Sequence, residues 1–548
     1  MLRPPARLTL DELLARRLFH IPPYQRAYSW HRKQRNDMFS DIKNLEGTPD
    51  GSHFMATVVG LRRTSRLIGA DQYSVIEVVD GQQRLTTLVL LLKAIEQELK
   101  CLRPDDAQDL QRILVKGDDL DLILLQTNHD NSDYCADYLR LGESTDVSDA
   151  QTLADKELLS AIHECKFFVN TWDAPMELLT IVKDQLYFIF YQIENEAAVY
   201  TVFETLNDRG LDVSWLDKLK SRLMGVAFGN NPDNSREHID ELHRIWGRIY
   251  RTVGLRQGLS TEALRFGATL ISSASLSKPL GEEGAVKSFT EQVGTSTPEA
   301  ITVSKWLLKV TTAVDKFLAD MRGVREAVTE ISQARLLAVA ILLSDFSADE
   351  KTQLLNEWEK TTFRIFGLLD KDARTGVGNY VRLARDIQNN SELSADDILQ
   401  RIRDLGASYS IDALLNQPED INWYEGWETE LRYLLFRYEE HLAEQQGQRF
   451  DNEQWRRIWE DSPSRSIEHI FPQSKGSQVP LEADQDGIFV HRLGNLLLLP
   501  PGLNSRLGDK DPKVKAPCYR QTGLFSACDV AQTIEDQGWG EAQIEERE

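Results

Sequence analysis

The chain has 548 residues, of which 41% are apolar and 27% charged, and its formal net charge at pH 7 is −23. A chain of this length and composition is expected to form several globular domains rather than one core. Phosphate neutralisation dominates non-specific DNA binding, so this acidity excludes a generic nucleic-acid coat and confines DNA contact to local basic patches. The sequence contains no run of eighteen apolar residues, so no membrane span is expected.

The cysteines and the N-terminus indicate a cellular compartment. Five cysteines are scattered without a CxxC pair, at Cys101, Cys135, Cys165, Cys518 and Cys528. This spacing favours reduced thiols and disfavours a cysteine-bound zinc site. Met1 to Arg7 lacks the apolar core of a secretory signal. We therefore expect a cytoplasmic protein that does not contact membranes.

The first hundred residues predict an α/β arrangement. Residues 8–18 have the apolar spacing of a short amphipathic helix, and residues 21–24 are expected to be extended because prolines interrupt them. β-branched and aromatic residues predict strands over 53–61 and 73–79. Residues 80–83 break this pattern, and the apolar run over 85–99 predicts a helix.

The middle of the chain, from about residue 105 to 420, is mostly helical by periodicity. Polar, Gly- or Ser-rich linkers are expected at 229–234, 272–284 and 294–298, and the run over 186–193 predicts a buried strand. We expect a long helix from Trp423 and a strand over 496–499. The acidic tail from Asp529 predicts a solvated end.

Four residues near the C-terminus have the types that phosphodiester hydrolysis needs. Glu468 and His469 are adjacent, Asn495 lies in a Gly-Asn-Leu turn, and Asn504 follows. A histidine can deprotonate water near neutral pH, and a carboxylate with an amide carbonyl suits a hard cation such as Mg²⁺. In a strand, Glu468 and His469 would point to opposite sides, so one can hold metal while the other faces water.

Basic residues follow this set and are suited to phosphate contact: Arg506, Lys510, Lys513 and Lys515. His491 is either a substrate contact or a structural histidine. Taken singly, Glu468 and His469 favour an ordinary helix edge, and the two asparagines favour simple turns. Their joint order, with Pro472 and the Gly-Asn-Leu-Leu turn between them, favours a nuclease.

A second set of candidate residues surrounds a glycine turn between a predicted strand and helix, at Asp80, Gly81, Gln82, Gln83 and Arg84. The start of a helix offers free N–H groups to an anion. The two glutamines can bond phosphate or base edges, Arg84 can hold phosphate oxygens, and Asp80 can ligate metal or orient water. The alternative is a helix start without a ligand. The chain contains no GxxxxGK[ST] loop.

Two further segments offer ligand contacts. Tyr24 can stack on a base and Arg26 can contact phosphate, with Gln25 between them, although the segment also fits a surface loop pinned by aromatic packing. Asn207 and Arg209 lie in a turn from which they could reach a ligand. Downstream, Ser214 and Asp217 have the spacing of a helix capping box: Asp217 is then only a cap.

Residues 420–530 resemble the His-Me finger (HNH) nucleases, through Glu468 to Pro472, Asn495 and Asn504. They are most similar to the C-terminal nuclease of the GmrSD-type modification-dependent restriction enzymes. The resemblance implies a ββα-metal fold with His469 as general base, Glu468 and Asn504 as metal ligands, and Asn495 as a bracing residue. Many relatives carry aspartate where this chain has Glu468, so the ligand geometry there stays open.

Residues 8–225 resemble the N-terminal domain of the same family, through the motifs around Tyr24, His53, Asp80 to Leu88, and Arg209. This resemblance implies a ParB/sulfiredoxin-like core that binds and hydrolyses a nucleoside triphosphate. The block from Asp80 to Arg84 would lie at the nucleotide, and residues 24–26 would line the same pocket. Relatives include phosphorothioate-sensing antiphage proteins and enzymes that attack glucosylated or otherwise modified cytosine DNA.

These observations predict a mainly α, multidomain protein with α+β parts: a nucleotide-binding sensor (1–225), a helical middle (226–415) and an HNH nuclease (416–548). We expect a nucleotide-regulated, modification-dependent DNA endonuclease of bacterial antiphage defence. It would use Mg²⁺ or another divalent metal and a nucleoside triphosphate, and homo-oligomerisation is left open. The alternatives are an RNA-cutting or indiscriminate abortive-infection toxin, and a nucleotide-gated DNA sensor without cleavage.

Overall fold

The computed structural model describes residues 5–22, 25, 27–116, 122–126, 133–193, 214–229, 235–320, 331–416, 421–448, 450, 456–459, 461–473 and 489–548. The protein is multidomain and mainly helical (64%), with a mixed sheet in the N-terminal region. Its two units comprise residues 1–268 with 280–312, and residues 269–279 with 313–548. The expected fold class is confirmed at this coarse level. The ParB-like and HNH folds and the three expected ranges stay predictions.

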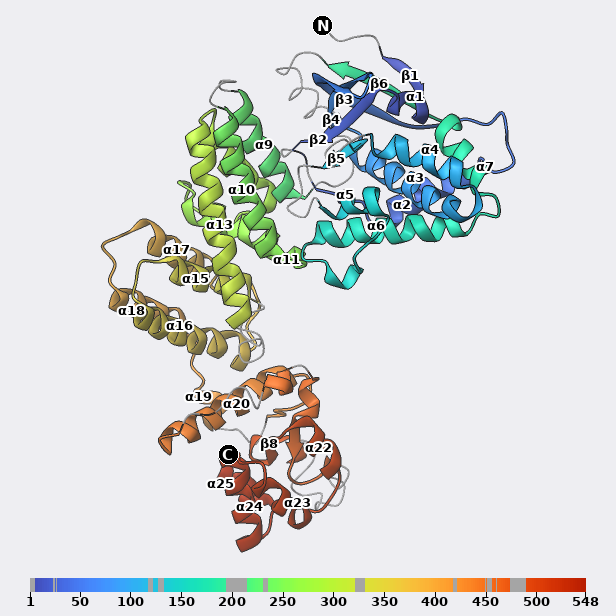
Figure 1. The fold of residues 1–548 in the computed structure, drawn as a ribbon. Coiled ribbons are helices and arrows are strands. Elements are labelled where there is room, and N and C mark those ends of the chain that lie inside the picture. Colours follow the sequence, from blue (N-terminus) through green and yellow to red (C-terminus); the bar gives the residue numbers. More distant parts are fainter. Residues whose placement is uncertain are drawn as a thin grey trace. The chain divides into compact units, whose positions relative to one another are not determined.

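Six strands form one mixed sheet in the described part of the first unit, in the order β1-β6-β3-β4-β2-β5 (Figure 1). They are β1 (Ala6–Thr9), β2 (Arg17–Ile21), β3 (His53–Ile68), β4 (Asp71–Asp80), β5 (Leu124–Gln126) and β6 (Leu186–Ile193). The pairs β1–β6 and β3–β4 are antiparallel, whereas β2–β4, β2–β5 and β3–β6 are parallel. The strands predicted at 53–61, 73–79 and 186–193 are confirmed.

The helix predicted over residues 8–18 is wrong in most of its length. Thr9 caps a helix, α1 (Leu10–Leu14), that has only five residues. Arg16 then adopts a positive φ of 51°, which turns the chain out of the helix and into β2. Leu18, one of the apolar residues that suggested a helix face, is instead buried in the sheet, because tertiary pairing overrides a short local pattern.

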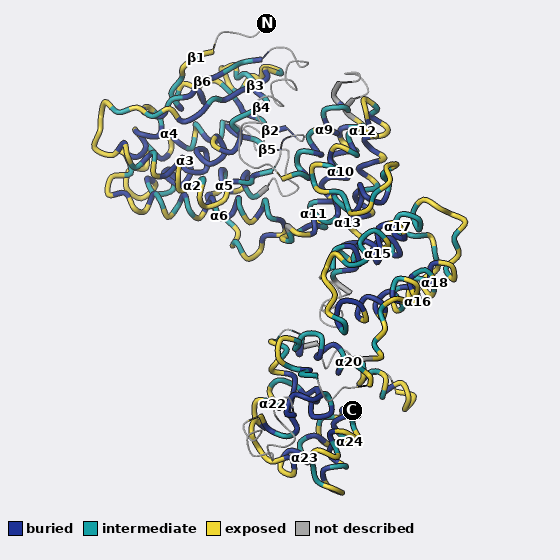
Figure 2. The backbone as a smooth tube through the Cα atoms, turned by 180° about the vertical axis from the view of Figure 1, so that it is seen from behind, coloured by how far each residue is buried: buried dark blue, intermediate teal, exposed yellow. Residues whose placement is uncertain are grey.

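Helix α3 (Gln82–Leu102) leaves β4 directly and is buried along most of its length (Figure 2). It packs against α4, α5, α6 and α7. The predicted helix over 85–99 is therefore confirmed. The other helices of this unit are α2 (Arg32–Lys43), α4 (Pro104–Leu114), α5 (Asp133–Leu141), α6 (Leu153–Asn170), α7 (Pro175–Thr180), α9 (Trp215–Gly229), α10 (Ser235–Val253) and α12 (Glu282–Val293). Helices α11 (Gln257–Ile271) and α13 (Thr297–Asp320) contribute residues to both units.

The second unit begins with helices and continues into a small two-stranded sheet. Its elements are α15 (Ser332–Leu343), α16 (Ala348–Thr362), α17 (Val377–Asn389), α18 (Ala395–Gly406), α19 (Asp412–Asn416), α20 (Glu428–Gln445), β7 (Ile467–His469), β8 (Leu496–Leu498), α22 (Pro501–Leu507), α23 (Pro512–Arg520), α24 (Phe525–Gln537) and α25 (Glu541–Arg547). The helix expected from Trp423 starts only at Glu428. No helix in the described part of the chain is long and apolar enough to cross a membrane.

The prediction of a solvated tail after Asp529 is wrong. Helices α24 and α25 pack on the second unit, where Val530, Ile534 and Ile544 are buried. Arg547 donates hydrogen bonds to the backbone carbonyl groups of Gly494 (2.7 Å) and Leu496 (2.8 Å). The acidic composition hid a helical spacing of apolar residues, so the tail is part of the structure around β8.

Candidate functional site

Strands β7 and β8 pair antiparallel and place the two central residues of the C-terminal set. Glu468 lies opposite Leu497 and His469 opposite Leu496. Successive residues of a strand point to opposite faces, so the two side chains enter different surroundings. Only 2% of Glu468 and 8% of His469 is exposed. The predicted strand over 496–499 is confirmed as β8, apart from its last residue.

His469 lies among aromatic and polar side chains. Its Nε2 atom is 3.2 Å from Nδ1 of His491 and 3.1 Å from Nε2 of Gln473. The ring of Tyr424 meets the His469 ring edge-on, with centroids 4.6 Å apart, and stacks on His491 at 5.4 Å. Nε2 of His491 is in turn 3.7 Å from Oε1 of Glu425. These contacts fix the plane of the His469 ring.

Burial, with smaller contributions from His491 and Lys515 in the same direction, lowers the pKa of His469 to about 3. The imidazole is therefore neutral at neutral pH, which is the form that can accept a proton. A general base must be unprotonated and within reach of its water. The surroundings of His469 meet the first of these two requirements.

Asn495 joins the residues after β7 to those before β8. Its Oδ1 atom accepts hydrogen bonds from the backbone N–H of Phe471 (2.7 Å) and from Nε1 of Trp539 (3.2 Å). Its Nδ2 atom donates to the carbonyl groups of Phe471 (3.0 Å) and Val490 (2.9 Å). The side chain is fully buried. This geometry suits a bracing residue rather than one that contacts substrate.

Gly494 precedes this asparagine at a point of close backbone approach. A Cβ atom at position 494 would overlap the backbone carbonyl oxygen of Ile544 in α25. Glycine is thus required for the last helix to lie against the turn before β8.

Glu468 points toward α23, where two side chains bind the same carboxylate oxygen. Oε1 of Glu468 is 2.7 Å from Nζ of Lys515 and accepts a hydrogen bond of 2.8 Å from the hydroxyl of Tyr519. Burial raises the pKa of Glu468, and Lys515 and Tyr519 oppose that rise. Tyr519 was not predicted as a site residue, although its spacing of four residues from Lys515 places both on one face of a helix.

The phosphate contact expected of Lys515 does not fit its position, because the side chain is fully buried. Arg506, Lys510 and Lys513 are exposed and stay available for such contact. Arg506 also lines a cavity of about 490 Å³ between α22 and α23, together with Pro500, Gly502, Leu503, Cys518, Gln521 and Thr522.

Asn504 lies on α22 beside the start of β7. Its Nδ2 atom donates to the carbonyl groups of Arg465 (3.0 Å) and Ile467 (2.9 Å), which leaves Oδ1 as the free end of the amide. Mg²⁺ prefers oxygen ligands such as an amide oxygen and a carboxylate. Asn504 and Glu468 therefore have the ligand types that a divalent cation needs. Among the described residues, no three His, Cys, Asp or Glu side chains form a metal-binding group.

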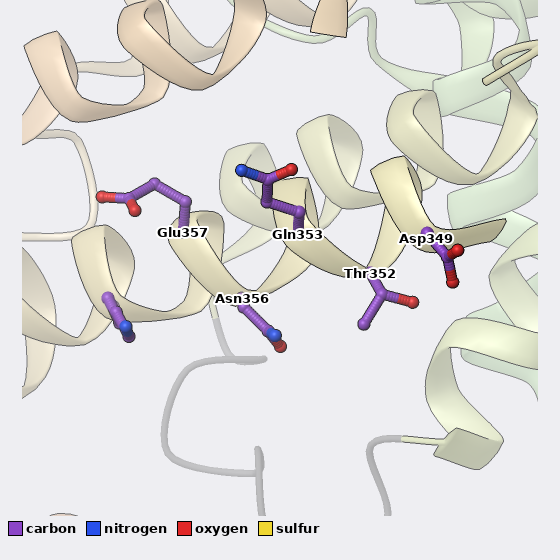
Figure 3. A pocket seen from close by; sticks show the side chains of 6 residues that line it. Asp349, Thr352, Gln353, Asn356 and Glu357 are labelled. Atoms are coloured by element: carbon purple, nitrogen blue, oxygen red, sulfur yellow. The ribbon is translucent and has the colours of Figure 1, made fainter. Parts of the chain in front are cut away.

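A second surface hollow, of about 360 Å³, lies along α16. Its lining side chains all project from this one helix, as Figure 3 shows: Asp349, Thr352, Gln353, Asn356, Glu357 and Lys360. They bring together no residue of either candidate set, so we assign the hollow no chemistry.

In the first unit, the Asp80 to Arg84 block forms the junction between β4 and α3. Gly81 is the residue before α3 and has a positive φ of 90°. Gln83 accepts a hydrogen bond from the backbone N–H of Ser29 (2.9 Å) and donates to the carbonyl of Ala27 (3.1 Å). Gln83 therefore ties the preceding loop to the helix start, and its amide is already engaged with the protein.

Gln25 and Gln82 form a buried pair next to this junction. Nε2 of Gln82 donates to Oε1 of Gln25 at 3.0 Å, and Nε2 of Gln25 donates to the carbonyl of Val79 at 2.7 Å. Lys220, also buried, donates to the backbone carbonyl of Gln25 at 3.3 Å. These amides organise the junction, and the ligand contacts expected of Gln25 and Gln82 stay predictions.

Arg84 is the exposed member of the block, and its guanidinium lies 5.6 Å from the centre of the Trp30 ring. An exposed cation one residue after the buried glutamines, in the first turn of α3, suits an anionic ligand. The predictions for Tyr24, Arg26, Asn207 and Arg209 concern residues outside the described part of the chain.

One further N-terminal candidate, His53, lies away from the junction of β4 and α3. His53 is six residues before Val59, the β3 partner of Asp80, which is about 20 Å along a strand. Its ring instead lies 3.5 Å from Asp41. Asp217 accepts a hydrogen bond from Ser214 (2.7 Å), whose hydroxyl accepts the backbone N–H of Asp217, so the predicted cap is confirmed.

Comparison with known proteins gives two matches to protein families. Residues 10–224 match the family described as GmrSD restriction endonuclease, N-terminal domain. Residues 409–548 match the GmrSD restriction endonucleases, C-terminal domain. Together the two matches cover more than half of the chain. No curated protein matches it.

Proposed function

Since this chain belongs to the GmrSD restriction endonuclease family and is therefore a nuclease that acts on DNA, we propose that it cleaves modified DNA under the control of a nucleoside triphosphate. The cleavage site is the surroundings of β7. The observation that carries this assignment is a buried, neutral histidine held by aromatic contacts, next to a strand residue whose carboxylate suits a metal.

In this proposal His469 accepts the proton of the attacking water, and its neutral imidazole is the form that can do so. His491 and Tyr424 orient the ring, and Asn495 holds the residues that follow it. A divalent cation bound by Glu468 and Asn504 would supply Lewis-acid stabilisation of the phosphate. Arg506, Lys510 and Lys513 would neutralise neighbouring phosphates.

Nucleotide control would belong to the junction of β4 and α3. Arg84 and the first turn of α3 are suited to a triphosphate, while the buried glutamines keep the junction in shape. The two functions lie in different units of the chain. The control is therefore a coupling between distinct sites, which requires states that both ligands bias.

The direct test is cleavage of matched DNA duplexes that are unmodified, phosphorothioated, hydroxymethylated or glucosylated, with Mg²⁺ and each nucleoside triphosphate in turn. We expect one modified duplex to be cut and His469→Ala to reduce the rate about 100-fold or more, the range for a general base. His441→Ala, an exposed histidine of α20, is the matched control.

Equal cleavage by His469→Ala and wild type would remove the assignment of the base. A parallel reaction on RNA of the same sequence separates the proposal from an RNA-cutting toxin. Binding of modified DNA without cleavage under any nucleotide would favour the sensor without nuclease activity.

A further inference from the structure

Lys515 is enclosed by oxygen atoms at the centre of the C-terminal site. Its Nζ atom lies 2.7 Å from Oε1 of Glu468, 2.7 Å from the carbonyl oxygen of His469 and 3.4 Å from that of Ile470. The side chains of Lys515 and Glu468 are 0% and 3% exposed. A buried ammonium group is tolerated only with such a counter-charge and hydrogen-bond acceptors.

These three oxygen atoms are also of the kind that hard divalent cations take as ligands. One carboxylate and two carbonyl oxygens converge on one point, and the lysine ammonium group occupies that point. Two cations that share one buried carboxylate repel each other, and the repulsion is strong where little water screens it. Lys515 and a metal ion at Glu468 therefore oppose each other.

We propose that Lys515 is a resident cation of the nuclease site, which weakens divalent-metal binding at Glu468 until the lysine moves away. The inference deepens the proposed function and rests on it, since it concerns the metal of the same site. Lys515 belongs to α23, and a shift of this helix would withdraw the ammonium group from Glu468.

The consequence is a nuclease with little affinity for metal in the absence of substrate. The carboxylate is neutralised internally, so free Mg²⁺ gains less from it. DNA phosphates would add ligands to the metal and counter-charge for the displaced lysine. The site would then assemble fully only with DNA in place, which suits an enzyme that must not cut unaided.

Mn²⁺ binding to the full chain, measured by calorimetry, tests the inference without a cleavage assay. Lys515→Met should bind Mn²⁺ at least about tenfold more tightly than wild type, because removal of a buried cation removes its repulsion. Arg520→Met removes an exposed charge from the end of the same helix and should leave the affinity unchanged. An acidic protein can bind Mn²⁺ at several places. The double variant Lys515→Met/Glu468→Gln therefore shows which part of the measured binding belongs to Glu468.

A folded Lys515→Met protein that binds Mn²⁺ no more tightly than wild type would overturn the inference. If this variant does not fold, Lys515→Gln applies the same test, because its amide still donates to the carbonyl of His469 without a charge. Failure of the proposed function has a different signature. In that case Glu468→Gln would leave Mn²⁺ binding unchanged in both the wild-type and the Lys515→Met background.

Discussion

At the scale of single residues, the candidate nuclease site depends on one buried asparagine whose polar side-chain atoms are all engaged. Asn495 makes four hydrogen bonds without being exposed. Buried polar groups cost free energy unless they are hydrogen-bonded. Each polar atom of this amide therefore needs a partner, and its neighbours supply all four bonds. The arrangement holds the backbone that follows His469 in place through Phe471.

We predict that Asn495→Ala loosens the residues after β7 before it unfolds the protein. Loss of four buried hydrogen bonds should destabilise this region by about 2–4 kcal/mol. Hydrogen exchange of peptides that contain Phe471 should become faster, and DNA cleavage should fall. Asn390→Ala, which changes an exposed asparagine of the same unit, serves as the control. Unchanged exchange at Phe471 would show that the amide does not brace the site.

At the scale of elements, a buried carboxylate joins α20 to α24. Glu439 is fully buried and accepts hydrogen bonds from the backbone N–H groups of Phe525 and Ser526 and from the Ser526 hydroxyl. Burial raises its pKa, the hydrogen bonds from Ser526 and Phe525 oppose this rise, and Asp529 adds to it. A carboxylate at the start of a helix is favourable for the dipole but costly to desolvate.

The raised pKa of Glu439 predicts a pH dependence of stability. The folded state binds the Glu439 proton more tightly than the unfolded state, so stability from this group falls as the pH rises above the unfolded value. The neutral Glu439→Gln variant lacks this loss. Its Tm relative to wild type should therefore increase between about pH 5 and about pH 8. The exposed Glu444→Gln on the same helix should show no such trend, and an opposite trend for Glu439→Gln would contradict the assignment.

The elements also show what the sequence could and could not predict. Long runs of β-branched or apolar residues predicted β3, β4, β6 and α3, because such runs have one stable way to be buried. Residues 8–18 were misassigned because a turn at Arg16 ends the helix early and starts a strand. The burial of Lys515 and of the tail could not be predicted, because a charged or acidic segment is ordinarily exposed and only its partners reveal otherwise.

At the scale of the whole molecule, the two candidate sites belong to different units of one chain. Arg84 is in the first unit, and His469 is in the second. A reason for this division is control: a cleavage site that responds to a nucleotide needs a separate place to bind it. The acidic net charge of −23 fits the same purpose, since it weakens contact with ordinary DNA.

We predict that Arg84→Ala lowers nucleoside triphosphate turnover more than about tenfold, a loss expected when a charge-assisted phosphate contact is removed. In the same variant, the rate of DNA cleavage should no longer change when the nucleotide is added. Metal binding at Glu468 should stay as in wild type. Arg112→Ala, an exposed arginine of α4 in the same unit, is the matched control. Turnover equal to wild type would refute the role of Arg84.

The glycine before Asn495 has a consequence for how this molecule can change over generations. A side chain at position 494 would overlap main-chain atoms of Ile544 and press against its side chain as well. No exchange at position 544 can therefore make room for it, and a second mutation cannot repair the first in place. A chain without this glycine would have to place α25 differently, so the turn before β8 and the final helix constrain each other's sequence.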